Sequence, residues 1–171
     1  MPVKFAFYTA THISAMLISI KRIVLFSLPI FCMLLLAPCN STAAKMPVAI
    51  FSSDKNVVKL EVAETSEQIQ RGLMYRMSLP EDSGMVFLFH PPRPTRFWMY
   101  HTLIPLDMIF VRDGKILRIC ENVPPCRSEN PHDCALYPEE GDITVSEVVE
   151  VNGGYCKRHG IKPSDTIKFA L

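Results

Sequence analysis

The common signatures of catalysis are missing from this sequence of 171 residues. It contains neither a G-x-S-x-G nucleophile turn nor an H-E-x-x-H zinc motif, and the glycine pair Gly153-Gly154 is not followed by the residues of a phosphate-binding loop. Internal repeats and low-complexity segments are absent as well. We therefore expect no cofactor, and we place an enzyme behind a binding protein among the candidate functions.

Acidic residues are missing from the first 45 positions. Lys21 and Arg22 precede an apolar run over residues 23–36, and small residues follow at 41–44, which is the order of a secretory signal peptide. The apolar run is shorter than the roughly 20 residues that span a bilayer. We predict that residues 1–45 are a signal peptide with a short linker. The protein is then periplasmic or secreted and contacts the membrane only through this segment.

Alternatives for the N-terminal segment stay open. It could be an uncleaved anchor, and Met16 could be the true start in place of Met1, because the charged region before the apolar run is then of ordinary length. The sequence L-A-P-C over residues 36–39 is similar to the lipid-attachment site of a lipoprotein, although Pro38 stands where a smaller residue is usual.

Basic residues are few in the remaining part, residues 46–171. Removal of the first 45 residues takes away four basic side chains and leaves 14 basic against 17 acidic side chains, a net charge of −3 with His neutral. Nucleic-acid binding needs a basic surface that displaces the counterions of phosphate groups, and no Lys or Arg cluster is left here. We therefore expect no nucleic-acid partner, and the partner is an unknown small molecule or protein.

Four cysteines lie in residues 46–171, an even number that favours disulfides in an exported domain. Cys126 and Cys134 close a short loop and form the preferred first pair, which leaves Cys120 with Cys156 as the second. A zinc site at Cys126, His132 and Cys134 is the alternative, but the spacing lacks the paired C-x-x-C knuckles of structural zinc. We therefore expect no metal.

Short Val- and Ile-rich runs between Gly and Pro turns predict a domain made mostly of strands. We expect strands over residues 47–51, 56–63, 85–89, 97–101, 106–111, 115–123, 145–151 and 166–170. A capping box at Thr65 and Gln68 predicts a helix over about 66–76, and a second short helix is expected near 155–159. Prolines at 91, 92 and 94 are expected to end the strand before them, and residues 126–142 to form a long loop. The pattern predicts one compact, mainly-β domain over residues 46–171, a β-sandwich or partly open barrel with one or two short helices.

Three motifs occur in order: G-L-M-Y-R at residues 72–76, G-M-V-F-L-F at 84–89 and F-W-M-Y-H-T-L-I-P-L-D at 97–107. The chain thereby resembles the domain of unknown function 192 family, whose pattern reads G-L-M-x-R, G-M-x-F-x-F and F-W-M-x-N-T-x-x-P-L-D. The similarity covers about residues 57–169 and implies a compact mainly-β domain without an established reaction. His101 replaces the family's Asn, Tyr100 stands where Lys is common, and Ser164 replaces Gly in a later G-I-x-x-G-D turn.

Asp107 is a candidate functional acid because it stands inside an apolar run, where a carboxylate needs a partner. Arg71, Arg76 and Arg96 are the plausible partners upstream. Asp107 could be a general base or a ligand contact, but we favour a structural ion pair, since structural networks also place carboxylates at such positions. In that case Asp107→Asn is expected to lower the stability of the fold.

The remaining candidates for a pocket or a buried polar network are Trp98, His101, Thr102 and Glu150. Aromatic rings with a polar group often line small-molecule sites, although they are more often part of a core. The preferred function is an exported ligand-binding or accessory domain built around these residues and Asp107. The alternative is a small periplasmic hydrolase that uses Asp107 or Glu150 together with His101.

Overall fold

The structure is a computed structural model that describes residues 47–51 and 56–171. The predicted signal peptide, its alternatives and the turn at residues 52–55 lie outside the described residues. No helix within residues 47–51 and 56–171 is long and apolar enough to cross a membrane.

The elements follow one another as β1 (Val48–Phe51), β2 (Val57–Ala63), α2 (Ser66–Arg71), β3 (Ser83–Thr95), β4 (Phe97–Trp98), β5 (Leu106–Arg112), β6 (Lys115–Val123), the 3-10 helix η1 (Pro131–Asp133), β7 (Leu136–Tyr137), β8 (Ile143–Asn152), α3 (Tyr155–Arg158) and β9 (Ile167–Ala170). The predicted strand and helix positions therefore recur, with the differences in length described below.

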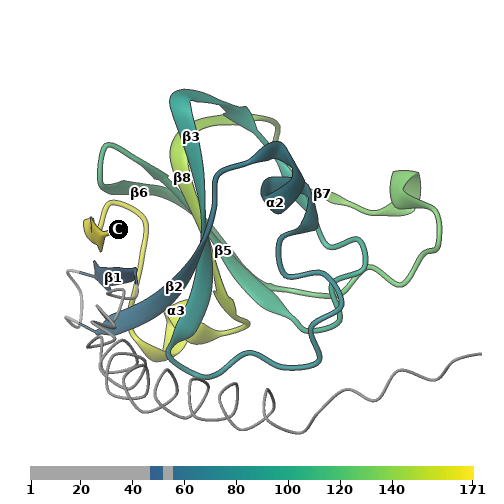
Figure 1. Cartoon of the computed structure of the whole chain (residues 1–171), viewed down its shortest axis with the longest axis horizontal. Coiled ribbons are helices and arrows are strands. Elements are labelled where there is room, and N and C mark those ends of the chain that lie inside the picture. Colours follow the sequence, from purple (N-terminus) through teal and green to yellow (C-terminus); the bar gives the residue numbers. More distant parts are fainter. Residues whose placement is uncertain (1–46, 52–55) are drawn as a thin grey trace, which may run out of the picture. The chain divides into compact units, whose positions relative to one another are not determined.

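Seven of the strands form one sheet in the order β6-β5-β8-β3-β2-β1-β9, in which only β2 and β3 are parallel. The sheet curls, so that the turn between β5 and β6 approaches the start of β9 (Figure 1). Here the N–H of Ile167 donates to the carbonyl of Gly114 at 2.9 Å, and the N–H of Ile116 donates to the carbonyl of Asp165 at 2.9 Å. The result is a half-barrel with short helices, which confirms the predicted mainly-β, partly open barrel.

Two apolar cores lie on opposite faces of this sheet, because successive side chains of a strand alternate in direction. One core, here called the α3-side core, contains Ile109, Val149 and the buried residues of α3. The other, the α2-side core, contains Phe87 and Met108 together with residues that follow α2. A single register step on β5 or β8 therefore decides which of the two cores a side chain enters.

Helix α2 begins as predicted, with the capping box formed by Thr65 and Gln68, but it ends earlier. Gly72 follows with φ +45°, a left-handed conformation that suits glycine and terminates the helix. The prediction that the helix continues to residue 76 was wrong. It rested on apolar spacing that continues past Gly72, whereas the helix ends at this glycine.

Strand β3 continues through the prolines that were expected to end it. Its pairing with β8 is interrupted between Leu88 and Arg93 and resumes where Arg93 lies opposite Val145. The prolines at 91 and 92 fall within this interruption, where no ladder hydrogen bond is required of them. The expected strand over 97–101 is also shorter, because only Phe97–Trp98 pairs with β7 and Tyr100 makes an isolated bridge to Cys126.

The loop after β6 is closed by a disulfide between Cys126 and Cys134, as predicted. Cys120 and Cys156 are free thiols, so the second predicted disulfide was wrong. Cys156 is buried in the α3-side core, whereas Cys120 packs against the α2-side core, and the sheet therefore separates them. The zinc alternative loses two thiolates to the disulfide, and no group of three or more His, Cys, Asp or Glu in the described part of the chain could hold a metal ion.

Candidate functional site

A cavity of about 190 Å³ lies between the end of α2 and strands β3, β4 and β8. Aromatic side chains form much of its wall, namely Phe87, Phe89, Phe97 and Trp98. The rings of Phe87 and Phe97 meet edge to face, with centroids 4.8 Å apart. Polar side chains form much of the rest, so the cavity combines aromatic contact surface with polar groups that could orient a ligand.

Glu150 is the acidic residue that lines this cavity. Its backbone on β8 pairs with Met85 of β3 and Met108 of β5, and its side chain therefore enters the α2-side core with only 5 % of its surface exposed. No described residue donates a hydrogen bond to its carboxyl group. Burial consequently raises the pKa of Glu150 to about 8, so the group is protonated at neutral pH when the cavity holds no ligand.

The glycines that open the first two motifs both adjoin Glu150. A Cβ atom on Gly72 would lie 3.2 Å from the ring of Phe87 and 3.9 Å from Oε2 of Glu150. A Cβ atom on Gly84 would lie 2.4 Å from the carbonyl oxygen of Glu150, which strand packing does not allow. Glycine at position 72 lets the chain after α2 approach the carboxyl group of Glu150, and glycine at position 84 lets strand β3 approach the backbone of Glu150.

Three arginines contribute to the same cavity: Arg71, Arg93 and Arg96. Arg96 donates to the carbonyl oxygens of residues 136, 138 and 139 at 3.1–3.3 Å, which fixes its position. The guanidinium of Arg93 lies 4.7 Å from the centroid of the Phe89 ring. Neither Arg71 nor Arg93 forms an ion pair with a described residue, so both guanidinium groups are available to an anion.

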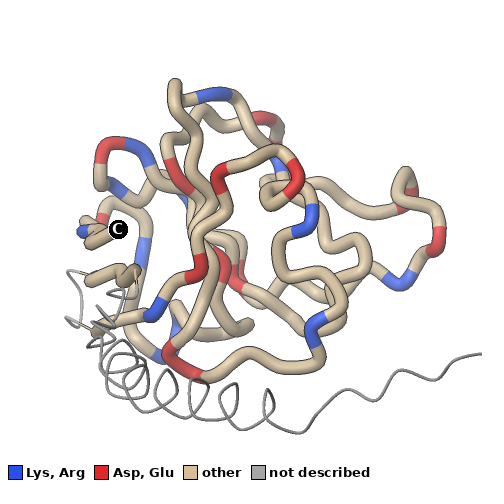
Figure 2. The backbone as a smooth tube through the Cα atoms, in the orientation of Figure 1, with Lys and Arg blue, Asp and Glu red and all other residues tan. Residues whose placement is uncertain are grey.

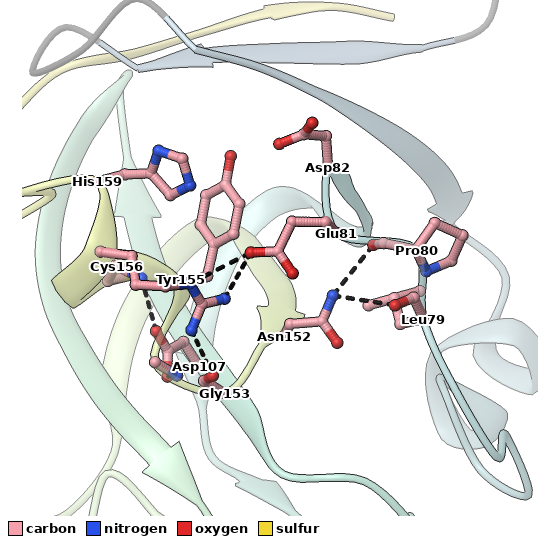
Figure 3. Close-up of polar contacts among 12 residues, drawn as sticks. Leu79, Pro80, Glu81, Asp82, Asp107, Asn152, Gly153, Tyr155, Cys156 and His159 are labelled. Atoms are coloured by element: carbon pink, nitrogen blue, oxygen red, sulfur yellow. Dashed lines mark hydrogen bonds and ion pairs between the residues drawn. The ribbon is translucent and has the colours of Figure 1, made fainter.

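Asp107 lies on the other face of the sheet and takes no part in this cavity. Its carboxylate accepts three backbone hydrogen bonds, from the N–H groups of Asn122 at 2.6 Å, Gly154 at 2.7 Å and Cys156 at 2.8 Å. Figure 3 shows the last of these, beneath the first turn of α3. The expected arginine partners were therefore wrong, because backbone N–H groups satisfy this carboxylate.

Two of the predicted candidates lie apart from Glu150. Arg76 forms a bidentate ion pair with Glu61 at 2.5 and 2.6 Å on the surface. The ring of His101 lies between Tyr75 and Tyr100, with centroid distances of 4.8 and 3.8 Å. In the described part of the chain, this ring makes no hydrogen bond with the carboxyl group of Asp107 or of Glu150.

The structure therefore brings together Arg71, Arg96, Trp98, Thr102 and Glu150, and it excludes Arg76, His101 and Asp107 from the cavity. Arg93 was not among the predicted site residues, because the prolines around it were expected to end the strand. Sequence reasoning also missed the role of the motif glycines. The available signal was their place at the start of two of the three motifs.

The charges around the cavity differ from those of the rest of the domain. Basic and acidic positions are interspersed along the described chain (Figure 2). The cavity instead has three arginines and a single, buried acid. An anionic group on a ligand would therefore be attracted to the cavity by its arginines.

Comparison with known proteins gives a family and no reaction. The model of the family described as "Uncharacterized ACR" matches residues 48–169. A solved structure from Novosphingobium aromaticivorans DSM 12444, of a protein of unknown function, is 35% identical, covers 72% of this chain and 83% of that chain, and has a TM-score of 0.61. No curated protein matches the chain.

A second solved structure comes from Sinorhizobium meliloti 1021 and is provisionally described as a transcription regulator. It is 36% identical, covers 72% of this chain and 91% of that chain, and also has a TM-score of 0.61. The family match extends over most of the chain and includes the three motifs at residues 72–76, 84–89 and 97–107, together with Glu150. The chain therefore belongs to the domain of unknown function 192 family (DUF192).

Proposed function

We propose that this protein is an exported ligand-binding protein, that its site is the cavity beside Glu150, and that its ligand is a small apolar molecule with an acidic group. One observation carries the proposal. A carboxyl group that is 5 % exposed borders a cavity and receives no hydrogen bond from any described residue.

Burial of such a group is unfavourable for the fold. A buried polar group without a partner costs on the order of 1–3 kcal/mol, and a buried charge without a partner costs more. Asp107 shows that this same sheet can satisfy a buried carboxylate fully. Among the described residues no fully enclosed side-chain oxygen or nitrogen lacks a partner, so the carboxyl oxygens of Glu150 reach the cavity, where they can bond to a ligand in place of water.

The rest of the cavity supports a ligand with two kinds of surface. The rings of Phe87, Phe97 and Trp98 offer contact to an apolar body. Arg71 and Arg93 offer guanidinium groups without an acidic partner, and a carboxylate can accept two hydrogen bonds from one such group. A volume of about 190 Å³ limits the buried part of the ligand to a group of modest size.

We do not propose a hydrolase. That alternative required a carboxylate in contact with a histidine, and the ring of His101 makes no hydrogen bond with Asp107 or Glu150 in the described structure.

Titration with aryl and alkyl carboxylates tests the binding function. We expect 3-phenylpropionate to bind in calorimetry and Arg71→Met to weaken binding about tenfold, the value of one charge-assisted hydrogen bond. Arg127→Met is the matched control, because Arg127 is exposed and does not line the cavity. The absence of binding at millimolar concentration, or an equal effect of both substitutions, would contradict the proposal.

Export is a separate part of the proposal, supported by the order of charged, apolar and small residues before position 46 and by a disulfide in the domain. N-terminal sequencing of the protein from membrane and periplasmic fractions should show a cut between about Cys39 and Lys45. An intact Met1 or Met16 terminus in the cytosol would refute it.

A further inference from the structure

We infer that the ligand of this cavity is a zwitterion, an apolar α-amino acid or a close analogue, whose ammonium group pairs with Glu150 and whose carboxylate pairs with Arg71 and Arg93. This inference rests on the proposed function and names the chemical class of its ligand.

The hydrogen-bonding capacity of Glu150 favours an ammonium group over a neutral acceptor. A ligand carbonyl could accept one hydrogen bond from the protonated carboxyl and would leave the second oxygen without a donor. An ammonium group brings three N–H donors and can satisfy both oxygens of the ionised carboxylate. The aromatic side chains of Phe87 and Phe97 line the same cavity and would stabilise a cation that lies over one of their rings.

The arginines decide against a simple amine. Glu150, Arg71, Arg93 and Arg96 are the titratable or charged residues that line the cavity, and the strand neighbours of Glu150 are Met85 and Met108. A cation without an acid group would meet Arg71 and Arg93, which have no acidic partner among the described residues, and Arg96, whose guanidinium lies 4.0 Å from Asp142. A plain carboxylate would pair with the arginines and could accept one hydrogen bond from the protonated Glu150, but it offers no donor to the second oxygen. A zwitterion brings an anion for the arginines and a cation for the ionised Glu150.

Binding of such a ligand must release a proton. The empty cavity holds Glu150 as COOH at neutral pH, because burial raises its pKa to about 8. The ammonium group keeps its own proton and pairs with COO⁻, so the carboxyl proton leaves to solvent. Affinity should then rise with pH, by on the order of 50-fold between pH 6 and pH 8, as the fraction of ionised Glu150 grows.

Calorimetry on the processed protein tests this at pH 6, 7 and 8, in two buffers of different ionisation enthalpy. The probes are L-phenylalanine, L-leucine and L-methionine, with 3-phenylpropionate and phenethylamine as versions that lack the amine or the acid. At pH 8 we expect at least one amino acid to bind about tenfold more tightly than 3-phenylpropionate, which lacks the amine, and than phenethylamine, which lacks the acid. At pH 7 its binding should release about one proton.

Two variants assign the effect to Glu150. Glu150→Gln should remove the pH dependence, the proton release and the preference for L-phenylalanine over 3-phenylpropionate. Its folding is checked by thermal denaturation, and we expect no loss of stability. Glu147→Gln is the matched control on the same strand, because Glu147 points to the other face and bonds to Ser146. It should leave affinity and proton release unchanged.

Three other outcomes would overturn the zwitterion inference, and one of them would also overturn the proposed function. If 3-phenylpropionate binds as tightly as every amino acid, without proton release, the zwitterion inference falls and the proposed function stands. If phenethylamine binds as tightly as L-phenylalanine, the assigned role of the arginines is wrong and the inference falls. If none of the probes binds at millimolar concentration, both the inference and the proposed function fall.

Discussion

Asp107 and Glu150 are two buried carboxyl groups on adjacent strands, and the protein treats them in opposite ways. Met108 lies opposite Glu150 in the ladder between β5 and β8, and Asp107 lies opposite Val151. This one-residue difference sends the two acids to opposite faces of the sheet. Asp107 meets three backbone donors near α3, whereas Glu150 meets a cavity and no donor among the described residues.

Asp107 stabilises the fold through its hydrogen bonds, whereas Glu150 forms no hydrogen bond with a described residue through its carboxyl group. Asp107 ties the end of β6 and the start of α3 to β5. In the same region Arg158 bonds to Glu81 at 2.8 Å, and the side chain of Asn152 donates to the carbonyl groups of Leu79 and Pro80 (Figure 3). Glu150 makes none of these contacts. Burial alone therefore does not tell which carboxyl group is available to a ligand.

The largest effect is expected at Asp107. Asp107→Asn keeps the size of the side chain, but its NH₂ group cannot accept the backbone N–H bonds that one carboxylate oxygen receives. Loss of charge-assisted bonds and an unpaired buried donor should lower the free energy of unfolding by about 4 kcal/mol. Urea denaturation measures it, with Asp113→Asn as an exposed control expected to change stability by less than about 0.5 kcal/mol. A variant as stable as the parent would remove the basis of the comparison.

Glu150→Gln should have the opposite sign. The folded protein keeps the proton of Glu150 up to a pH of about 8, whereas the unfolded chain loses it near 4.5, so rising pH between these values favours unfolding. The variant should be more stable than the parent by about 3 kcal/mol at pH 7 and equal to it near pH 4.5. Chemical denaturation across this range measures the difference. A difference that does not change with pH would show that Glu150 has a partner in the fold.

The reactivity of Cys156 compares Asp107 and Glu150 by their effect on the opening of α3. Burial, and next the charge of Asp107, raise the pKa of this thiol, so alkylation in the native protein requires α3 to open. We expect Asp107→Asn to speed alkylation of Cys156 by at least about tenfold and Glu150→Gln to leave it unchanged. Mass spectrometry of timed samples gives both rates, with the half-buried Cys120 as the internal reference. Equal rates in the two variants would contradict a specific role of Asp107 at α3.

The smallest effect is expected for a third carboxylate, Glu61, which lies on the surface. Its hydrogen bond and ion pair with Arg76 lower its pKa, so this contribution to stability is present above about pH 4.5 and disappears as pH falls through the lowered pKa. Because the two side chains are 53% and 33% exposed, Glu61→Gln should cost less than about 1 kcal/mol. Denaturation at pH 7 and pH 3 tests the value. A loss as large as that of Asp107→Asn would mean that exposure does not weaken this pair.

Local chemistry explains what could be predicted from the sequence. The capping box at Thr65 depends on residues only three positions apart. The disulfide between Cys126 and Cys134 closes a loop short enough to be judged from spacing. Strand alternation gave the fold class for the same reason, because period-two patterns are local.

Apart from the end of helix α2, the errors arose where distant segments meet. The second disulfide failed because the sheet stands between Cys120 and Cys156, which spacing does not reveal. Strand β3 continues beyond the prolines that were expected to end it, because its pairing with β8 resumes at Arg93. The arginines expected beside Asp107 lie elsewhere, and backbone N–H groups from β6 and α3 take their place.

The sequence alone determined that Asp107 and Glu150 stand among apolar residues, and therefore that each would be costly to bury without a partner. It also placed glycine at 72 and 84, where the family motifs begin. Only the tertiary structure decided which acid finds donors, because that depends on strand order, on register and on which face each side chain enters. A carboxyl group carries the same chemistry at either position, but the backbone groups and the cavity around it come from segments up to about 80 residues away, as Gly72 and Glu150 show.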